Sequence, residues 1–308
     1  MLSGAVVKAS ILGMIRFLPL QTALPDWGTA LAAAGLFAAL YGVVIGLAQR
    51  NPKVVLAYSS VSQMGFIVAV IGMGMIAGDD RAALAAAFYA AHHVLVKGAL
   101  FLSVGVIAAT GSRRLWPMLL PAAIIAVGLG GLPLTGGALA KIVVDGPLGD
   151  GTASKVATLS AIGTTMLMLQ FLRSLTKTAS QDPDATAAAG LVWPWLATAA
   201  VSLVVPWTLY LTVPRGTLPD PLAAAVLWKA LWPVLLGAVL AIALWRWVRR
   251  LPRVPEGDIV VAIDGGVQVA VAWGKALERM DSALRQWPAA GVSLLILTVA
   301  LGAAVFAR

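Results

Sequence analysis

Long apolar stretches recur along the chain and alternate with short polar or Pro/Gly breaks. Most of them reach or exceed the roughly 20 residues that a helix needs to cross about 30 Å of hydrocarbon. A helix also satisfies its own backbone hydrogen bonds in lipid. The pattern predicts an all-α, polytopic integral membrane helical bundle with about nine spans. The expected spans are residues 3–18, 27–49, 54–77, 82–109, 115–148, 154–175, 191–213, 222–248 and 289–307.

The stretch at 115–148 is too long and too interrupted for one straight helix. It contains a Gly/Pro-rich run at 128–133 and a glycine pair at 136–137. Proline removes a backbone donor and glycine loosens the helix, so we expect a discontinuous helix. Unwound backbone at membrane depth is tolerated only inside protein or beside a hydrated cavity. The alternative is a tight loop between two short helices.

The segment at 255–287 is polar but keeps helical periodicity. Apolar residues recur at intervals of three or four, and charged residues fill the other positions. This pattern predicts an amphipathic helix on the cytoplasmic surface, packed on lipid or on a neighbouring subunit. The apolar stripe comprises Ile263, Val267, Ala270, Gly274, Leu277, Met280, Leu284 and Trp287.

Composition supports a membrane protein and excludes several kinds of site. The chain is 60% hydrophobic and only 11% charged, whereas a soluble domain carries about 25% charged residues. It has no cysteine and two histidines, which excludes disulfide scaffolds, thiolate zinc sites and iron–sulfur ligation within it. It also lacks a phosphate-binding loop and a nucleotide fingerprint. We therefore expect no metal and no cofactor in this chain.

The net charge of +9 reflects membrane topology rather than nucleic-acid binding, because most arginines lie at span ends. The positive-inside rule makes the more basic side cytoplasmic and predicts a multi-pass protein of the cell inner (plasma) membrane. On that side lie Arg50, Lys53, Arg113, Arg114, Arg173, Lys177, Arg246, Arg249, Arg250 and Arg253. On the other side lie Arg16, Arg81, Lys155, Arg215 and Arg308.

Several lysines fall inside predicted spans. A lysine at the centre of a span costs about 2.5–3.5 kcal/mol even on the mildest scale, so each needs a reason. Lys97 lies deepest, and Lys141 follows the Gly/Pro break. For the others, simpler explanations exist: Lys53 and Lys229 can snorkel to an interface, and Lys8 can lie near one. For Lys141 the alternative is an ion pair with Asp145, four residues further on.

Tyr89, His93 and Lys97 are spaced by four residues and therefore share one helical face. A row of exchangeable protons, joined to other buried lysines by water, can relay protons. His92 points about 100° away and is expected to pack or to hydrogen-bond between helices. A polar run at 58–65 either joins helices by hydrogen bonds or holds water near Lys53.

Two long motifs resemble a known family. They are NPKVVLAYSSVSQMGF (51–66) and AHHVLVKGALFLSVGVI (91–107), in which Gly98 departs from the pattern. They resemble the antiporter-like membrane subunits shared by respiratory complex I (NADH:quinone oxidoreductase), membrane hydrogenases and Mrp-type cation/proton antiporters. GLPLTGGALAK (131–141) resembles the family's broken helix with its lysine, and SGAVVKASILGMIRF (3–17) resembles an earlier one. The resemblance extends to about residue 175.

This resemblance implies a proton relay in two inverted halves of about five helices each. Lys8 matches the central lysine of the first half-channel and Lys53 its linking lysine. His93 and Lys97 match the central relay, and Lys141 matches the exit-side lysine of the second half. Tyr89 stands where some relatives have another histidine.

The implied protein is a proton-translocating subunit of a multisubunit membrane complex. We favour a Mrp-type antiporter over a redox-driven pump, because the C-terminal region lacks a long lateral helix. Any redox chemistry would lie in other subunits. The alternative is a non-conducting scaffold subunit. We expect a translocation core at 1–180, additional transmembrane helices at 181–254, and the surface helix with a last span at 255–308.

One departure from the family pattern concerns the expected partner subunits. The family has further spans before the lysine that Lys8 matches, including one with a glutamate, whereas Glu256 and Glu278 both fall in the polar segment. The stretch at 3–18 therefore resembles the end of a span whose beginning is missing. We expect other integral membrane subunits, one of which supplies those helices, and otherwise an inactive first half-channel.

Overall fold

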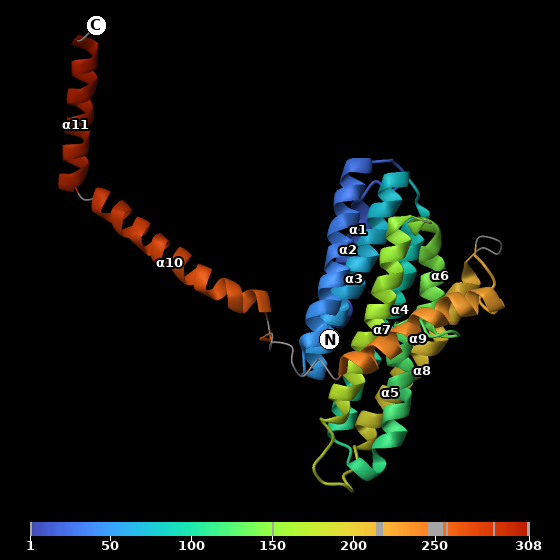
Figure 1. Ribbon diagram of the computed structural model, residues 1–308. Helices are drawn as coiled ribbons and strands as arrows, with labels where there is room; N and C mark the ends of the chain where they lie inside the picture. Colours follow the sequence, from blue (N-terminus) through green and yellow to red (C-terminus); the bar gives the residue numbers. More distant parts are fainter. Residues whose placement is uncertain are drawn as a thin grey trace. The chain divides into compact units, whose positions relative to one another are not determined.

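The computed structural model describes residues 2–149, 151–213, 218–245, 255–256, 258–285 and 287–306. These residues form helices and no strand (Figure 1). The helices are α1 (Leu2–Phe17), α2 (Pro25–Ala48), α3 (Pro52–Ala77), α4 (Arg81–Ala108), α5 (Leu115–Leu129), α6 (Gly136–Leu148), α7 (Thr152–Thr176), α8 (Ala189–Thr212), α9 (Ala224–Trp245), α10 (Asp258–Leu284) and α11 (Trp287–Phe306), with a 3₁₀ turn, η1, at Ser112–Arg114. The chain divides into two compact units, Met1–Arg253 and Val254–Arg308.

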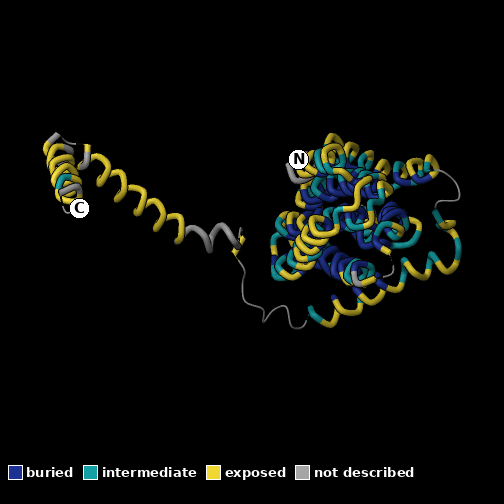
Figure 2. Tube along the Cα trace, turned by 90° about the horizontal axis from the view of Figure 1, so that it is seen from above, coloured by how far each residue is buried: buried dark blue, intermediate teal, exposed yellow. Residues whose placement is uncertain are grey.

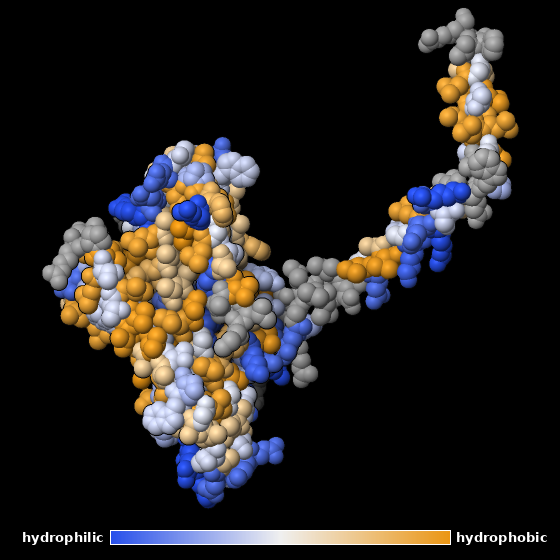
Figure 3. Space-filling model, turned by 180° about the vertical axis from the view of Figure 1, so that it is seen from behind, coloured by the Kyte–Doolittle hydropathy of each residue, from blue (hydrophilic) through white to orange (hydrophobic). Residues whose placement is uncertain are grey.

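The predicted polytopic helical membrane protein is confirmed. In the described part of the chain, α2, α3, α4, α7, α8 and α9 are long and apolar enough to cross a membrane. The remaining expected spans appear as the 16-residue α1, the pair α5 and α6, and α11, whose apolar part is shorter. Figure 3 shows apolar side chains over the middle of one face of the first unit and polar ones at its two ends.

The ends of α3 show how the sequence sets helix boundaries. Asn51 caps the first turn, since its Oδ1 accepts a hydrogen bond from the Lys53 backbone N–H at 3.0 Å. Gly78 ends the helix with a φ of +66°, which glycine adopts without strain. In the next turn the Arg81 guanidinium donates to the Asp79 carboxylate, and this hydrogen bond lowers the pKa of Asp79.

Helices α2 and α3 pack backbone against backbone. A Cβ atom at Gly35 of α2 would lie 2.5 Å from the Gly65 carbonyl oxygen and the Ala69 nitrogen of α3. The same close approach recurs one heptad away on α2, at Gly28 and Gly42. Small residues at such positions are typical of helix pairs in membranes, because they let the backbones approach.

Helix α4 lies at the centre of the first unit, where it packs against α1, α3, α5, α6 and α8. Figure 2 shows buried residues concentrated inside this bundle and exposed residues around it. Helices α3 and α4 are mostly buried, whereas most of α8 and α9 is not. Side chains that α4 turns towards α3, α6 and α7 are therefore removed from the surroundings of the bundle.

The predicted break in 115–148 is confirmed. Helix α5 ends at Leu129 and α6 begins at Gly136, and the two follow one another along α4 (Figure 1). Gly131 has a φ of +101° and Leu134 one of +65°, so the backbone between the helices is not helical. The break therefore places non-helical backbone inside the bundle, beside α4.

The second unit consists of α10 and α11. The predicted helix at 255–287 is present as α10, and its residues from Gly266 to Ala283 are exposed in this chain. Arg285 and Asp281 form an ion pair over 2.8 Å at its end. Six of the arginines used to orient the spans lie outside the described residues: Arg215, Arg246, Arg249, Arg250, Arg253 and Arg308.

Candidate functional site

Lys97 is fully buried, with 0% of its surface exposed, on the face of α4 that meets α3. Its Nζ donates a hydrogen bond to the Leu56 carbonyl oxygen at 2.6 Å and another to the Ser59 hydroxyl. Both acceptors belong to one turn of α3. A buried ammonium group is costly unless oxygen atoms replace its water, and here a backbone carbonyl and a hydroxyl do so.

Lys8 and His93 lie in the same region as Lys97. Lys8 is only 5% exposed on α1, which packs against α4, the helix that carries His93 and Lys97. His93 is completely buried, and its ring nitrogens accept or donate no hydrogen bond to any described residue. The structure thus brings Lys8, His93 and Lys97 together from two helices.

Tyr89 begins a chain of hydrogen bonds that crosses three helices. Its hydroxyl on α4 donates to Oε1 of Gln63 on α3. The Gln63 amide donates to the Thr164 hydroxyl on α7 at 2.7 Å, and that hydroxyl donates to the Ser160 carbonyl oxygen at 2.7 Å. The sequence signalled this chain only through the polar run at 58–65. On α7 the side chain that extends the chain of bonds is Thr164, a hydroxyl-bearing residue inside the predicted span 154–175 that the sequence reasoning did not single out.

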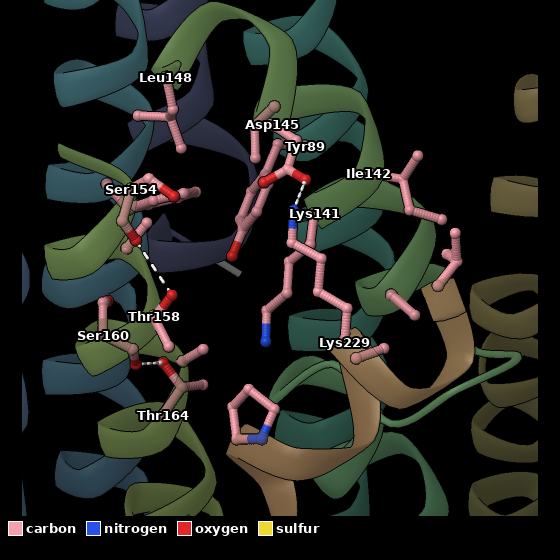
Figure 4. A pocket seen from close by; sticks show the side chains of 18 of the residues that line it. Tyr89, Lys141, Ile142, Asp145, Leu148, Ser154, Thr158, Ser160, Thr164 and Lys229 are labelled. Atoms are coloured by element: carbon pink, nitrogen blue, oxygen red, sulfur yellow. Dashed lines mark hydrogen bonds and ion pairs between the residues drawn. The ribbon is translucent and has the colours of Figure 1, made fainter. Parts of the chain in front are cut away.

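A cavity of about 210 Å³ adjoins this chain. Tyr89, Gln63 and Thr164 form part of its buried wall, and Lys141 on α6 points into it from the other side (Figure 4). The Lys141 ammonium group donates to the Gly130 carbonyl oxygen, which the break leaves without a helical partner. Tyr89 of α4 and Lys141 of the broken helix therefore line one cavity.

Gly131 makes the position of Lys141 possible. A Cβ atom at residue 131 would overlap the Lys141 Nζ, and its φ of +101° is one that other residues rarely adopt. Gly131 thus allows both the non-helical backbone of the break and the position of the Lys141 side chain.

The alternative explanation of Lys141, an ion pair with Asp145, is wrong. Asp145 instead pairs with Lys229 on α9 (Figure 4). The side chains of Asp145 and Lys229 are 45% and 65% exposed, and both lie at the edge of the cavity. Lys229 therefore forms an ion pair with a residue of α6, in addition to reaching towards the interface as the snorkelling explanation expects.

Lys53 is separate from the buried cluster. Its side chain is exposed at the first turn of α3. The polar run does not gather around it, because Ser59 and Gln63 bond to α4 and α7. The expectation that the run joins helices is confirmed, whereas the expected water site near Lys53 has no support from these contacts.

His92 packs against the break. A Cβ atom at Gly136 would lie 2.5 Å from His92 Nδ1, and one at Gly137 would lie 3.4 Å from Nε2. Both nitrogens are buried without a hydrogen-bond partner among the described residues. The structure therefore confirms packing, one of the two expected roles, and shows no interhelical hydrogen bond from this ring to the residues it describes.

The fold and the site define a polytopic membrane protein that keeps several ionisable residues inside its bundle. A family model described as NADH:quinone oxidoreductase/Mrp antiporter, transmembrane, matches residues 1–170. The chain belongs to this family. The match covers α1 to α6 and most of α7, and α8 to α11 lie outside it.

Two relatives support the assignment. The antiporter subunit mnhA2 of Staphylococcus aureus is 31% identical over 182 residues, which is 52% of this chain and 23% of that protein. A Na⁺/H⁺ antiporter subunit of Bacillus subtilis is 35% identical over 119 residues, which is 36% of this chain and 15% of that protein. The chain therefore matches less than a quarter of the length of either relative.

Proposed function

We propose that this chain is a proton-translocating, antiporter-like subunit of a multisubunit membrane complex. The observation that carries the proposal is the complete burial of Lys97 beside His93 and Lys8. Ionisable residues inside a membrane bundle are costly and typically mark an ion or proton pathway. The names of the relatives, both antiporter subunits, support the same class.

The contacts suggest a path for the proton. Lys8, His93 and Lys97 form its central part, and Tyr89 continues the face of α4 towards the cavity. Lys141 receives the proton on the far side of that cavity. A lysine can serve at each step because its protonation responds strongly to nearby charges. Lys53 is included as the linking lysine on the family resemblance, and its exposed position suits a group near the aqueous surface.

We assign the complex to the Mrp-type cation/proton antiporters rather than to redox-driven pumps. The relative from Bacillus subtilis carries the name of a Na⁺/H⁺ antiporter subunit. In this proposal the complex lies in the inner membrane with the basic loops cytoplasmic. The core is residues 1–180, followed by additional helices at 181–254 and the surface and last helices at 255–308.

The glutamate-bearing helix that the family places before the lysine matched by Lys8 is proposed to come from another chain of the complex. Purification from the native membrane in mild detergent, followed by mass spectrometry, tests this. Co-purifying antiporter subunits support the assignment. Iron–sulfur or quinone-reactive partners contradict the Mrp assignment.

The decisive experiment compares Lys97→Ala with Lys177→Ala in the complete complex. Lys177 is an exposed lysine at the end of α7 and serves as the matched control. Cation-driven proton flux is measured in inverted vesicles, and assembly is followed on native gels. We expect Lys97→Ala to lose flux with assembly intact and Lys177→Ala to keep it. Unchanged flux in Lys97→Ala overturns the relay and favours the non-conducting scaffold.

A further inference from the structure

The cavity beside Lys141 carries charge at its edge as well as at its wall. Of the described residues that line it, the charged ones are Lys141, Asp145 and Lys229. Figure 4 shows Lys229 reaching from α9 to Asp145 on α6, while Lys141 points into the cavity below them. The described lining of the cavity therefore holds one carboxylate and two lysine side chains.

Lys141 and Asp145 are four residues apart on α6, so their side chains lie on the same helical face within mutual reach. They do not bond to each other in this arrangement. Lys229 forms the ion pair with the Asp145 carboxylate, and Lys141 donates a hydrogen bond to the Gly130 carbonyl oxygen instead. A carbonyl accepts a hydrogen bond from a neutral amine as well as from an ammonium group, whereas a carboxylate favours the ammonium form.

Lys229 belongs to a part of the chain that the family match does not include. The match ends at residue 170, and α9 begins at Ala224. Helix α9 packs against α7, and its Val226, Ala230 and Pro233 complete the wall of the cavity. Helix α9, which lies outside the family match, thus supplies the lysine that pairs with Asp145.

We propose that Lys229 is a positioning residue that holds Asp145 away from Lys141 and so leaves Lys141 able to release its proton to the cavity. This inference rests on the proposed function, because it assigns Lys141 a proton to exchange. When the Asp145–Lys229 pair opens, the carboxylate turns to Lys141 and retains it as an ammonium ion. The pair therefore acts as a gate at the exit-side lysine.

The test compares Lys229→Gln with the double variant Asp145→Asn/Lys229→Gln in the complete complex. In the single variant the Asp145 carboxylate is free to pair with Lys141 and to keep it protonated. We therefore expect antiport to fall about tenfold or more. In the double variant no carboxylate remains, so flux recovers most of that loss. Lys229→Arg, which keeps the pair, and Lys155→Gln, an exposed lysine of α7, serve as controls with native flux. A double variant no more active than the single one overturns the proposal and makes the pair a structural tether.

A second measurement does not depend on transport. Lys141 is acylated with N-hydroxysuccinimidyl acetate in the purified complex, and the modified peptide is quantified by mass spectrometry with exposed Lys177 as the internal reference. An ammonium group does not react, so we expect slower acylation of Lys141 in Lys229→Gln than in the double variant, although both remove the bridge at the edge of the cavity. Equal rates overturn the inference.

The two proposals fail separately. Unchanged flux in Lys97→Ala contradicts the proton relay, whatever the acylation rates show. A flux loss in Lys97→Ala together with equal acylation rates supports the relay and contradicts the gate.

Discussion

The Nζ atom of Lys97 on α4 lies 2.6 Å from the carbonyl oxygen of Leu56 on α3, and that carbonyl also accepts a hydrogen bond from the Ser60 hydroxyl at 3.2 Å. A backbone carbonyl is a fixed acceptor, since it cannot rotate away as a side chain does. It therefore holds the lysine at one position on α3 in either protonation state. The Ser59 hydroxyl, by contrast, both donates and accepts, and can follow a change in the charge of Lys97.

Ser59→Ala removes the adjustable partner of Lys97. The ammonium group is then left with one oxygen acceptor, and we expect a loss of about 1–3 kcal/mol in stability together with reduced flux. Ser103→Ala is the control, because its buried hydroxyl donates to the Leu100 carbonyl oxygen of its own helix and not to an acceptor of Lys97, so its loss is nearly neutral. Thermal unfolding of the purified chain and vesicle flux measure both effects. Equal behaviour of the two alanine variants contradicts the role of Ser59.

Tyr89→Phe tests whether the Tyr89 hydroxyl takes part in transport. The change removes one donor and leaves Gln63 Oε1 buried without it, which costs about 1–3 kcal/mol. We expect slower antiport in the assembled complex. Tyr210→Phe is the matched control, since that hydroxyl donates to the Pro219 carbonyl oxygen and not to the row on α4. If both phenylalanine variants transport alike, Tyr89 does not belong to the path.

Gly131→Ala displaces Lys141 from the Gly130 carbonyl oxygen. The new Cβ atom overlaps the ammonium group and the backbone is strained, so we expect flux to fall about tenfold or more. Gly149→Ala carries comparable strain at a φ of +63°, but its Cβ atom meets nothing within 4 Å. It should lose some stability and keep its flux. If both variants lose flux, backbone strain alone explains the effect.

Gly35→Ala separates α2 from α3. Its Cβ atom would lie 2.5 Å from backbone atoms of α3 that cannot move aside, and we expect a destabilisation of about 1–3 kcal/mol. Gly98→Ala is the control within the same bundle, because its Cβ atom would lie 3.6 Å from Thr198 Cγ2, an ordinary contact. It should be neutral or stabilising by about 0.5–1 kcal/mol. Thermal unfolding of the purified protein distinguishes them, and a lower melting temperature for Gly98→Ala than for Gly35→Ala is the opposite of this expectation.

The helices, the break and the buried position of Lys97 follow from local patterns in the amino-acid sequence. Hydropathy and helical periodicity are local properties, so they locate apolar stretches, the Gly/Pro interruption at 128–137 and the shared face of Tyr89, His93 and Lys97. The family motifs at 51–66 and 91–107 are likewise contiguous in the chain, and the family match confirmed what they indicated.

The partner of each side chain, by contrast, depends on how the helices pack against one another. Asp145 lies one helical turn from Lys141, yet it pairs with Lys229, 84 residues further along the chain. Ser59 and Gln63 follow Lys53 closely in sequence, yet they bond to α4 and α7 while Lys53 is exposed. Spacing places residues on one face of their own helix, but the rotation and packing of the other helices decide which groups meet that face.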